Sequence, residues 1–367
     1  MMKHITAALY AVIVALSTAG CAQNSADTVI TESTAEVTEI NSEIQTEAQT
    51  KSLAPAEVYL NGLENEEDMW YSSDERYSEI VEVLKKEYHY SRDVQGVFIV
   101  ADDEDIIFFA GMNSYESDGI TKVGPYTTYE IGSVTKMFTA SCVLLLCEQG
   151  KMSLDDTLGK YWPEYEIGAD ITIYQLLHMQ SGIHDFEHTM SDFVNEDTPE
   201  DLRKRADCWE VKAQTGEPLT DEDFLELVSH KKLNNEPGTV FEYSNTNYKL
   251  LAMIVEMVSG QSFADFVKEN IFDKCGMEHS SIAAVGDVTS VPRETVYPHC
   301  TYTHFIRGAG DMHSCAADLI AFDRALMAGD IINDESLEKM FTIDKGYGCG
   351  LEPWKGPLPI LNIMAAW

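Results

Sequence analysis

The sequence is short of basic residues. Its 367 residues include 25 lysines and arginines against 62 aspartates and glutamates, which gives a formal net charge of −37 at pH 7. A surface with this excess of negative charge repels phosphate backbones and anionic membrane faces, so the composition argues against a nucleic-acid-binding function. The composition is otherwise that of a globular protein, with 44% hydrophobic and 24% charged residues.

The N-terminal apolar run is too short to be an ordinary transmembrane anchor. Ala7–Leu16 is a ten-residue run, whereas a spanning helix needs about 20 apolar residues. Small residues follow it and end at Gly20-Cys21, a pattern that resembles the signal peptide and lipobox of bacterial lipoproteins. We therefore expect a signal peptide at 1–20 and lipidation of Cys21, which would hold an exported protein on the extracytoplasmic face of the cell membrane, in the cell envelope. The alternative is a secreted protein with a chance cysteine at this position.

Metal-binding patterns are also missing. The eight cysteines include no Cys-x-x-Cys pair, and no cysteine–histidine cluster has the spacing of a zinc site. We expect no metal and no cofactor. If Cys21 carries a lipid, the seven cysteines that remain are an odd, scattered set, which we interpret mostly as small buried apolar residues rather than a disulfide framework.

The chain divides into a tether and a folded domain. Residues 22–55 hold ten serines and threonines, six acids and no aromatic residue, so they cannot bury enough apolar surface to order themselves. We expect a disordered acidic tether at 21–55 and one folded domain at 56–367. Hydrophobic periodicity predicts a hairpin of strands at 96–101 and 105–110, an irregular acidic segment at 187–222, and several helices. The predicted helices cover 76–88, 133–149, 173–177, a stretch starting at 220, 247–258 and 262–272.

One Ser-x-x-Lys sequence stands at the start of an apolar helix. Ser133 and Lys136 lie three residues apart, which places both on one helix face and lets the lysine approach the hydroxyl. A lysine that loses its proton there could take the Ser133 proton, while the helix N-terminus favours developing negative charge. Two further Ser-x-x-Lys sequences, at 229–232 and 336–339, do not open an apolar helix after a glycine. The competing interpretation of the first is a capping serine with a solvated lysine.

A second candidate is the triplet Tyr243-Ser244-Asn245, which follows a Pro-Gly turn and precedes an apolar helix. A tyrosine near the nucleophile can relay protons, and the amide of Asn245 can hold a substrate carbonyl. The alternative is a packed loop tyrosine, with the asparagine capping the next helix.

Together, the two motifs and their order resemble the serine β-lactamase and penicillin-binding-protein superfamily, in the branch with class C β-lactamases, D-Ala-D-Ala carboxypeptidases and esterases. Further segments agree with the resemblance, among them MSLDDTLGKYWPEY, ITIYQLLHMQSGI and GAGDMHSCAADLIAFDRAL. It covers residues 70–350. It implies an α/β (α+β) fold, in which an antiparallel sheet flanked by helices adjoins an all-helical region, with the site between them. It also implies that Ser133 is the acylated nucleophile and Lys136 its partner, with Tyr243 catalytic and Asn245 substrate-binding.

The third motif of this superfamily, His-x-Gly or Lys-Thr-Gly on a late strand, is missing. The last histidine is His313, and Lys355-Gly356 is a lone dipeptide beside prolines that suit no central strand. We therefore expect a C-terminally truncated chain that lacks the last strands and the second oxyanion donor that the family places there. Two lone histidines, His178 and His184, are interpreted as packing or surface residues.

Two functions from different classes follow. One is an exported serine acyl hydrolase acting on a D-Ala peptide, a β-lactam or an ester. The other is an inactive lipoprotein that retains a peptide-binding cleft. The motifs do not separate the three substrate classes, because acylation of one serine serves all of them. The expected partners are a small molecule or peptidoglycan peptide and, through the lipid, the membrane.

Overall fold

The structure of the protein is a computed structural model. It describes residues 15–16, 69–90, 96–102, 105–112, 123–186, 194, 198–207, 220–282, 306–353 and 365–366. The predicted tether at 21–55 and the lipidation site Cys21 lie outside these residues, as do Lys355 and Gly356.

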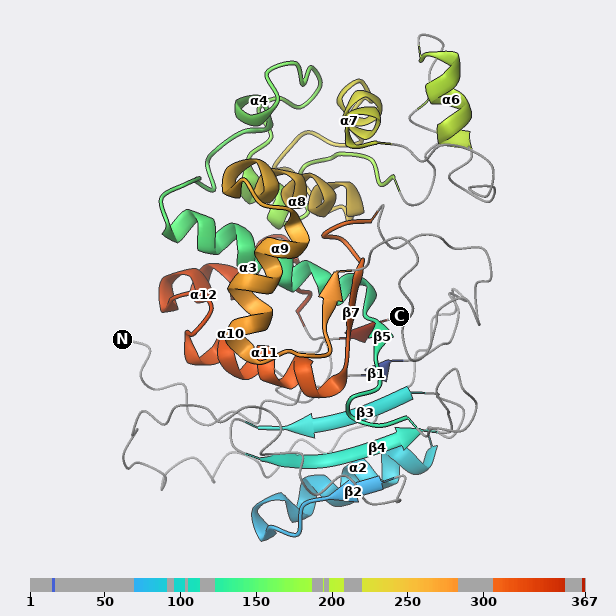
Figure 1. Ribbon diagram of the computed structural model, residues 1–367, viewed down its shortest axis with the longest axis vertical. Helices are drawn as coiled ribbons and strands as arrows, with labels where there is room; N and C mark the ends of the chain where they lie inside the picture. The colour runs from blue at the N-terminus through green and yellow to red at the C-terminus, as the bar shows by residue number, and fades with distance from the viewer. Residues whose placement is uncertain are drawn as a thin grey trace.

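A three-stranded antiparallel sheet forms one end of the molecule (Figure 1). Its order is β2 (Met69–Tyr71), β4 (Ile106–Met112) and β3 (Gly96–Ala101). The predicted hairpin is confirmed, with β4 starting one residue later than expected and ending two residues later. The register shifts between Val100 and Ala101.

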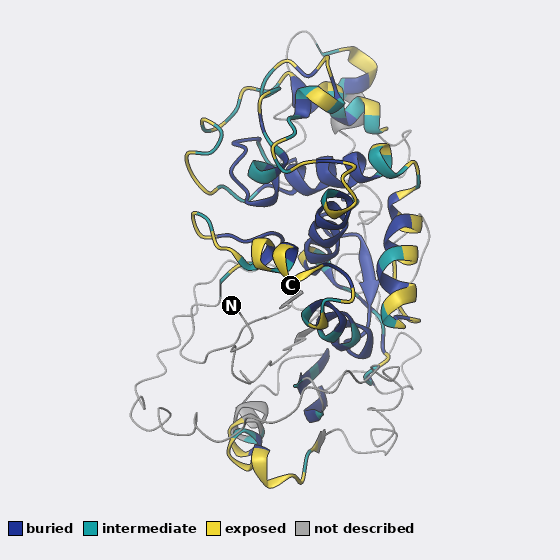
Figure 2. Ribbon diagram, turned by 90° about the vertical axis from the view of Figure 1, so that its left-hand side faces the viewer, coloured by how far each residue is buried: buried dark blue, intermediate teal, exposed yellow. Residues whose placement is uncertain are grey.

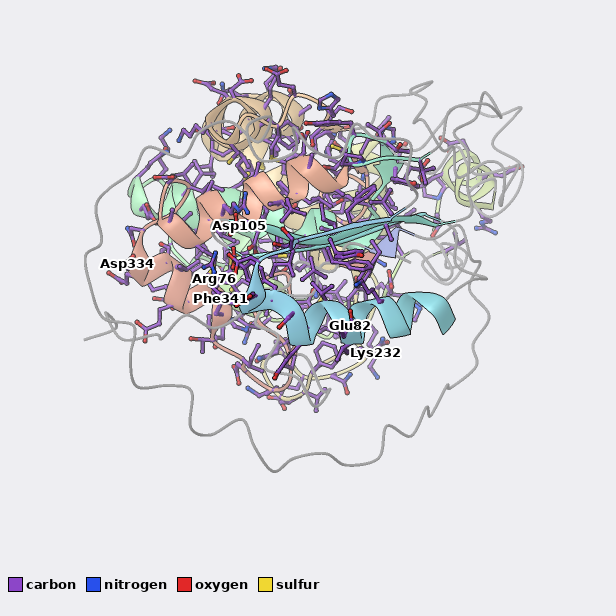
Figure 3. All side chains as sticks on the ribbon, turned by 90° about the horizontal axis from the view of Figure 1, so that it is seen from below. Arg76, Glu82, Asp105, Lys232, Asp334 and Phe341 are labelled. Atoms are coloured by element: carbon purple, nitrogen blue, oxygen red, sulfur yellow. The ribbon has the colours of Figure 1, made fainter. Side chains whose placement is uncertain are left out.

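Both faces of the β3–β4 pair are largely buried, which explains why these two strands are apolar. Val97 and Ile99 of β3 belong to the main core, whereas Val100 and Phe108 belong to a smaller core under α2 (Ser78–Tyr90). The alternation follows from the two-residue period of a strand. Figure 3, which shows the molecule from below, shows α2 running along one side of this sheet.

An arginine side chain of α11 (Ala316–Ala328) holds the β3–β4 turn through hydrogen bonds to its backbone. Arg324 of this helix donates to the Asp102 carbonyl from Nε at 2.9 Å and from Nη2 at 2.7 Å, and to the Asp105 carbonyl at 3.2 Å. On the other side of the turn, the Tyr77 hydroxyl donates to Asp102 Oδ2 at 2.5 Å. The turn therefore connects α11 with the segment that leads into α2.

A second antiparallel sheet has the order β5 (Tyr129–Glu130), β7 (Met312–Ser314) and β6 (Ser281–Ile282). Tyr129 pairs with Ser314, and Ser281 pairs with His313. The fold is thus mixed α/β as predicted, and the described strands form two small three-stranded sheets and one two-stranded pair. Strand β5 of this second sheet leads directly into the turn that contains Ser133.

Helices make up the rest of the described core. Besides α2 and α11, the helical elements have the following bounds: η1 Glu75–Tyr77, η2 Gly132–Val134, α3 Thr135–Glu148, α4 Leu158–Tyr161, α5 Ile173–Leu177, α6 Glu200–Asp207, α7 Asp221–Ser229, α8 Asn245–Ser259, α9 Phe263–Val267, the π-helical turn η4 Lys268–Phe272, α10 Asp273–Cys275 and α12 Asp334–Phe341. Figure 2 shows central helices that are almost wholly buried and outer helices with exposed faces. Helix α3, which follows the turn containing Ser133, is buried from Thr135 to Leu146.

Helix ends agree with the capping signals in the sequence. Thr220 and Asp223 form a capping box at the start of α7, and Gly260 ends α8 in the left-handed conformation. One expectation was wrong: the segment 187–222, predicted to be irregular, contains α6. Its sequence EDLRKRAD has a single apolar leucine, so apolar periodicity gives no signal there.

Two short features lie near the chain ends. β1 (Ala15–Leu16), inside the predicted signal peptide, pairs in parallel with β8 (Ala365–Ala366).

Within the described ranges, no single helix is long and apolar enough to cross a membrane. The helical segments Asn245–Ser259 and Phe263–Cys275 together have the length and apolar composition of a membrane span, but they meet at a bend of 79°.

Candidate active site

Ser133 stands where the second sheet meets the central helix. The chain leaves β5, turns at Gly132 with φ of +50°, and enters the 3₁₀ turn η2 that contains Ser133. The first α-helical residue is Thr135, so Ser133 lies just ahead of the helix rather than in its first turn. The side chain of Ser133 is exposed, as a nucleophile that meets an external substrate must be.

Lys136, by contrast, is completely buried behind the serine. Its Nζ atom lies 3.0 Å from Ser133 Oγ, 2.6 Å from Asn245 Oδ1 and 2.6 Å from the Ala309 carbonyl oxygen. The predicted pairing of serine and lysine is therefore present in the structure.

These three hydrogen bonds of Lys136 have a chemical consequence. An ammonium has three N–H donors and no acceptor, so the charged form can donate to all three oxygens. A neutral amine has two N–H donors and one lone pair. The oxygens of Asn245 and Ala309 can only accept, which directs both N–H groups to them and leaves the lone pair facing Ser133 Oγ. The geometry suits an amine that removes the serine proton.

Tyr243 approaches the serine from a distant part of the sequence. Its hydroxyl lies 2.7 Å from Ser133 Oγ, and its ring lies 4.9 Å from Lys136 Nζ. The ring also packs edge-on against Tyr347, with 6.2 Å between ring centroids. The hydroxyl is placed where it can exchange a proton with the serine.

Asn245 is held from two sides. Its Oδ1 accepts from Lys136, and its Nδ2 donates to Asp185 Oδ2 at 3.2 Å. The Asp185 carboxylate also accepts from the backbone N–H of Asn245 at 3.2 Å. The amide therefore orients the lysine, and its predicted contact with substrate stays a prediction.

The other two Ser-x-x-Lys sequences do not form such a site. Ser229 donates to the Glu226 carbonyl at 3.4 Å at the end of α7. Lys339 forms an exposed ion pair with Glu335. These residues provide matched controls for experiments on Ser133 and Lys136.

The two histidines have the packing and surface roles expected of them. His178 is buried, with Nδ1 3.0 Å from the Tyr347 carbonyl and Nε2 3.6 Å from Cys349 Sγ. Burial lowers the pKa of His178, although the Tyr347 carbonyl opposes this. His184 is half-buried beside Asn234.

The described cysteines are free thiols, and three of them are buried: Cys142, Cys315 and Cys349. Cys315 lies beside His279 and Asp318, and the potential donor atoms of the three side chains lie within 4.8 Å of one another. The Asp318 carboxylate already accepts from the His279 backbone N–H at 2.8 Å and the Ser280 hydroxyl at 2.7 Å. Burial raises the pKa of the Cys315 thiol, which opposes the thiolate that a metal requires.

Sequence reasoning missed the groups that hold the lysine in place. Ala309 acts through its backbone carbonyl, which gives no side-chain signal, and Asp185 acts through Asn245. The only signal for Ala309 was its position in the segment GAGDMHSC, which the resemblance had singled out.

Comparison with known proteins identifies a family whose sequence pattern this chain matches. The family model described as Beta-lactamase matches residues 78–347. A penicillin-binding protein of Bacillus subtilis is 30% identical over 294 residues, which are 71% of this chain and 61% of that protein. The chain thus spans about three fifths of the length of that relative.

Solved structures agree on the fold. A penicillin-binding protein from Bacillus halodurans has a TM-score of 0.55 at 24% identity, covering 74% of this chain and 85% of that one. The D-amino acid amidase from Ochrobactrum anthropi SV3, complexed with L-phenylalanine, has a TM-score of 0.55 at 21% identity, covering 72% and 76%.

Proposed function

The chain belongs to the β-lactamase family, and from that premise we propose that it is an exported serine acyl hydrolase that works through an acyl-enzyme on Ser133. The observation that carries the proposal is the exposed Ser133 Oγ, which lies 2.7 Å from Tyr243 Oη and 3.0 Å from Lys136 Nζ. A nucleophile within hydrogen-bond reach of an oriented base is the arrangement that covalent catalysis requires.

In the acylation step, Ser133 Oγ bonds to the substrate carbonyl carbon while its proton passes to the neutral amine of Lys136. The tetrahedral intermediate then collapses. The bond from carbon to the leaving nitrogen or oxygen breaks as that atom takes a proton from Tyr243, which recovers one from the Lys136 ammonium. Tyr243 is suited to this relay because its hydroxyl lies near Ser133 Oγ and its ring near Lys136 Nζ.

In the deacylation step, a water molecule attacks the ester carbon and gives up one proton. The ester bond to Ser133 Oγ breaks, the serine regains its proton, and the carboxylic acid leaves. Lys136 accepts the proton of the water, and Tyr243 donates the proton that Ser133 regains and recovers one from Lys136.

The substrates proposed are D-Ala-terminated peptides, β-lactams and small esters. The names of the relatives, a penicillin-binding protein and a D-amino acid amidase, support an amide or lactam carbonyl. Since one acyl-enzyme serves all three classes, pocket shape decides among them.

Intact-protein mass spectrometry tests the proposal with two probes, a labelled penicillin and a fluorophosphonate. We expect a mass shift in wild type and in the control Ser229→Ala, and none in Ser133→Ala. A shift that persists in Ser133→Ala would refute the assignment. D-Ala peptide binding without any adduct in wild type would favour the alternative, an inactive chain that retains a peptide-binding cleft.

We also propose lipid anchoring at Cys21, on the evidence of the Ala7–Leu16 run and the small residues that end at Gly20. A single acyl chain binds membranes only marginally, so stable attachment implies several chains on this residue. Membrane fractionation of wild type and Cys21→Ser, expressed in a bacterium, tests this. Equal release of both proteins into the soluble fraction would refute it.

A further inference from the structure

A short loop behind the catalytic lysine connects it to a buried carboxyl group. In this loop, the Ala309 carbonyl accepts from Lys136 Nζ at 2.6 Å, and the Gly308 carbonyl accepts from the Thr139 hydroxyl at 2.7 Å. The loop ends at Asp311, whose Oδ1 accepts the Gly308 backbone N–H at 2.8 Å. The Asp311 side chain therefore closes the loop that presents the Ala309 carbonyl to the lysine.

The second oxygen of this carboxyl group is left without a partner. Asp311 is 1% exposed, and among the described residues its buried Oδ2 atom has no hydrogen-bond partner. A buried polar atom without a partner costs free energy, and this cost is larger for a charged oxygen than for a neutral one. The environment therefore disfavours the carboxylate form.

The surrounding charges do not offset the cost of ionising Asp311. The cations that act most strongly on Asp311 are Arg307 of the loop and Lys249 of α8. Lys249 Nζ lies 3.2 Å from Asp221, and Arg307 pairs with both Asp221 and Glu256. These two cations thus already face two carboxylates, and ionised Asp311 would add a third negative charge. Burial raises the pKa of Asp311 to about 7, against the hydrogen bond from Gly308 and the two cations.

We propose that Asp311 is a positioning residue that sets the Ala309 carbonyl on Lys136, and that its ionisation controls how Ser133 acylation depends on pH. The inference rests on the proposed function. While Asp311 is neutral, Lys136 can give up its proton and turn its lone pair to Ser133 Oγ. Once Asp311 ionises, its unmatched negative charge favours the ammonium form of Lys136, which cannot accept the serine proton.

Two substitutions separate shape from charge. Asp311→Asn keeps an Oδ1 acceptor for the Gly308 N–H but cannot ionise, whereas Asp311→Ala removes the acceptor as well. Asp318→Asn is the control, because it also changes a buried carboxyl group, but one that bonds to His279 and Ser280 rather than to the lysine loop. The measurement is the rate of fluorophosphonate labelling of Ser133 between pH 5 and 9, by intact mass.

We expect Asp311→Asn to label within about threefold of wild type at pH 6 and to shift the rising limb of the pH profile to lower pH by about one unit. We expect Asp311→Ala to label at least tenfold more slowly at every pH, with Asp318→Asn superimposing on wild type. If Asp311 had only a structural role, substituting it would change stability without shifting the rising limb of the pH profile. An Asp311→Asn profile that coincides with wild type therefore overturns the inference while leaving the proposed function intact.

Urea unfolding gives a second readout that needs no catalysis. Because the folded-state pKa of Asp311, about 7, lies above the ordinary aspartate value of 3.8, the folded protein holds this proton more tightly than the unfolded chain. The resulting stability is complete below pH 3.8 and is lost as pH rises through 7. Wild type should lose more stability than Asp311→Asn between pH 5 and 8, and equal losses would refute the ionisation. If wild type is not labelled at all, the proposed function fails, and the control over acylation fails with it.

Discussion

The hydroxyl oxygens of Ser133 and Tyr243 lie 2.7 Å apart although the two residues are 110 positions apart in the chain. Ser133 enters from β5, and Tyr243 precedes α8 by two residues. The contact depends on the packing of the two helices that follow these residues, α3 and α8.

Tyr243→Phe removes one hydroxyl and keeps the ring that packs on Tyr347. We expect acylation of Ser133 to slow by roughly 10²–10⁴-fold, the usual range for a lost proton-transfer group. Stopped labelling time courses with the fluorophosphonate measure the rate. Tyr174→Phe, which removes a hydroxyl bound to Asp344, is the control and should label normally. A loss below tenfold in Tyr243→Phe would mean that another group relays the proton.

Lys136→Ala removes the base. We again expect a loss of roughly 10²–10⁴-fold in acylation rate, with a lower midpoint of urea unfolding, because the oxygens of Asn245 and Ala309 lose a buried donor. The exposed control Lys339→Ala should change neither value. If Lys136→Ala acylates within tenfold of wild type, Tyr243 is the first alternative base to test.

The sequence was sufficient for local structure and insufficient for the groups that hold the lysine. Helix starts could be predicted because capping residues such as Thr220 and Ser262 act on their own next turn. The pairing of Ser133 with Lys136 could be predicted from the spacing together with the preceding glycine and the apolar helix, because the same spacing at 229–232 and 336–339 lacks that context. The family resemblance strengthened the prediction that Tyr243 lies near Ser133. The Ala309 carbonyl had no such signal, because a backbone oxygen is present at every residue.

Arg324→Leu tests the clamp between α11 and the β3–β4 turn. The carbonyls of Asp102 and Asp105 would lose a charged donor, so we expect a loss of about 1–3 kcal/mol in the free energy of unfolding. Labelling of Ser133 per folded molecule should not change, because the turn lies in the other sheet. Arg76→Leu is the control, since Arg76 pairs with Asp105 at the exposed end of the same turn (Figure 3). A smaller stability loss from Arg324→Leu than from Arg76→Leu would contradict the clamp.

His178 should make the protein sensitive to acid. Its folded-state pKa is lowered from 6.5, mainly by burial, so the unfolded chain takes up a proton first as pH falls. The stability contributed by neutral His178 is therefore present above pH 6.5 and is lost below it. Asn can still donate to the Tyr347 carbonyl, so His178→Asn should lose less stability than wild type between pH 7 and 5. Denaturant titrations at both pH values measure this, with His184→Asn as the control; parallel losses in wild type and His178→Asn would contradict it.

Gly350 allows the chain to pass close to the catalytic helix. A Cβ atom at this position would lie 2.6 Å from the Lys136 carbonyl oxygen, and φ is +83°. Gly346 has φ of +107° and no atom within 4 Å of the same Cβ position. Both alanine variants carry the cost of a left-handed residue, of order 1 kcal/mol, but only Gly350→Ala must also displace the backbone of α3. We therefore expect Gly346→Ala to lose stability alone, and Gly350→Ala to lose more stability and to slow Ser133 labelling per folded molecule. Equal labelling rates in the two variants would show that the first turn of α3 tolerates the displacement, and that the position of Lys136 does not depend on this contact.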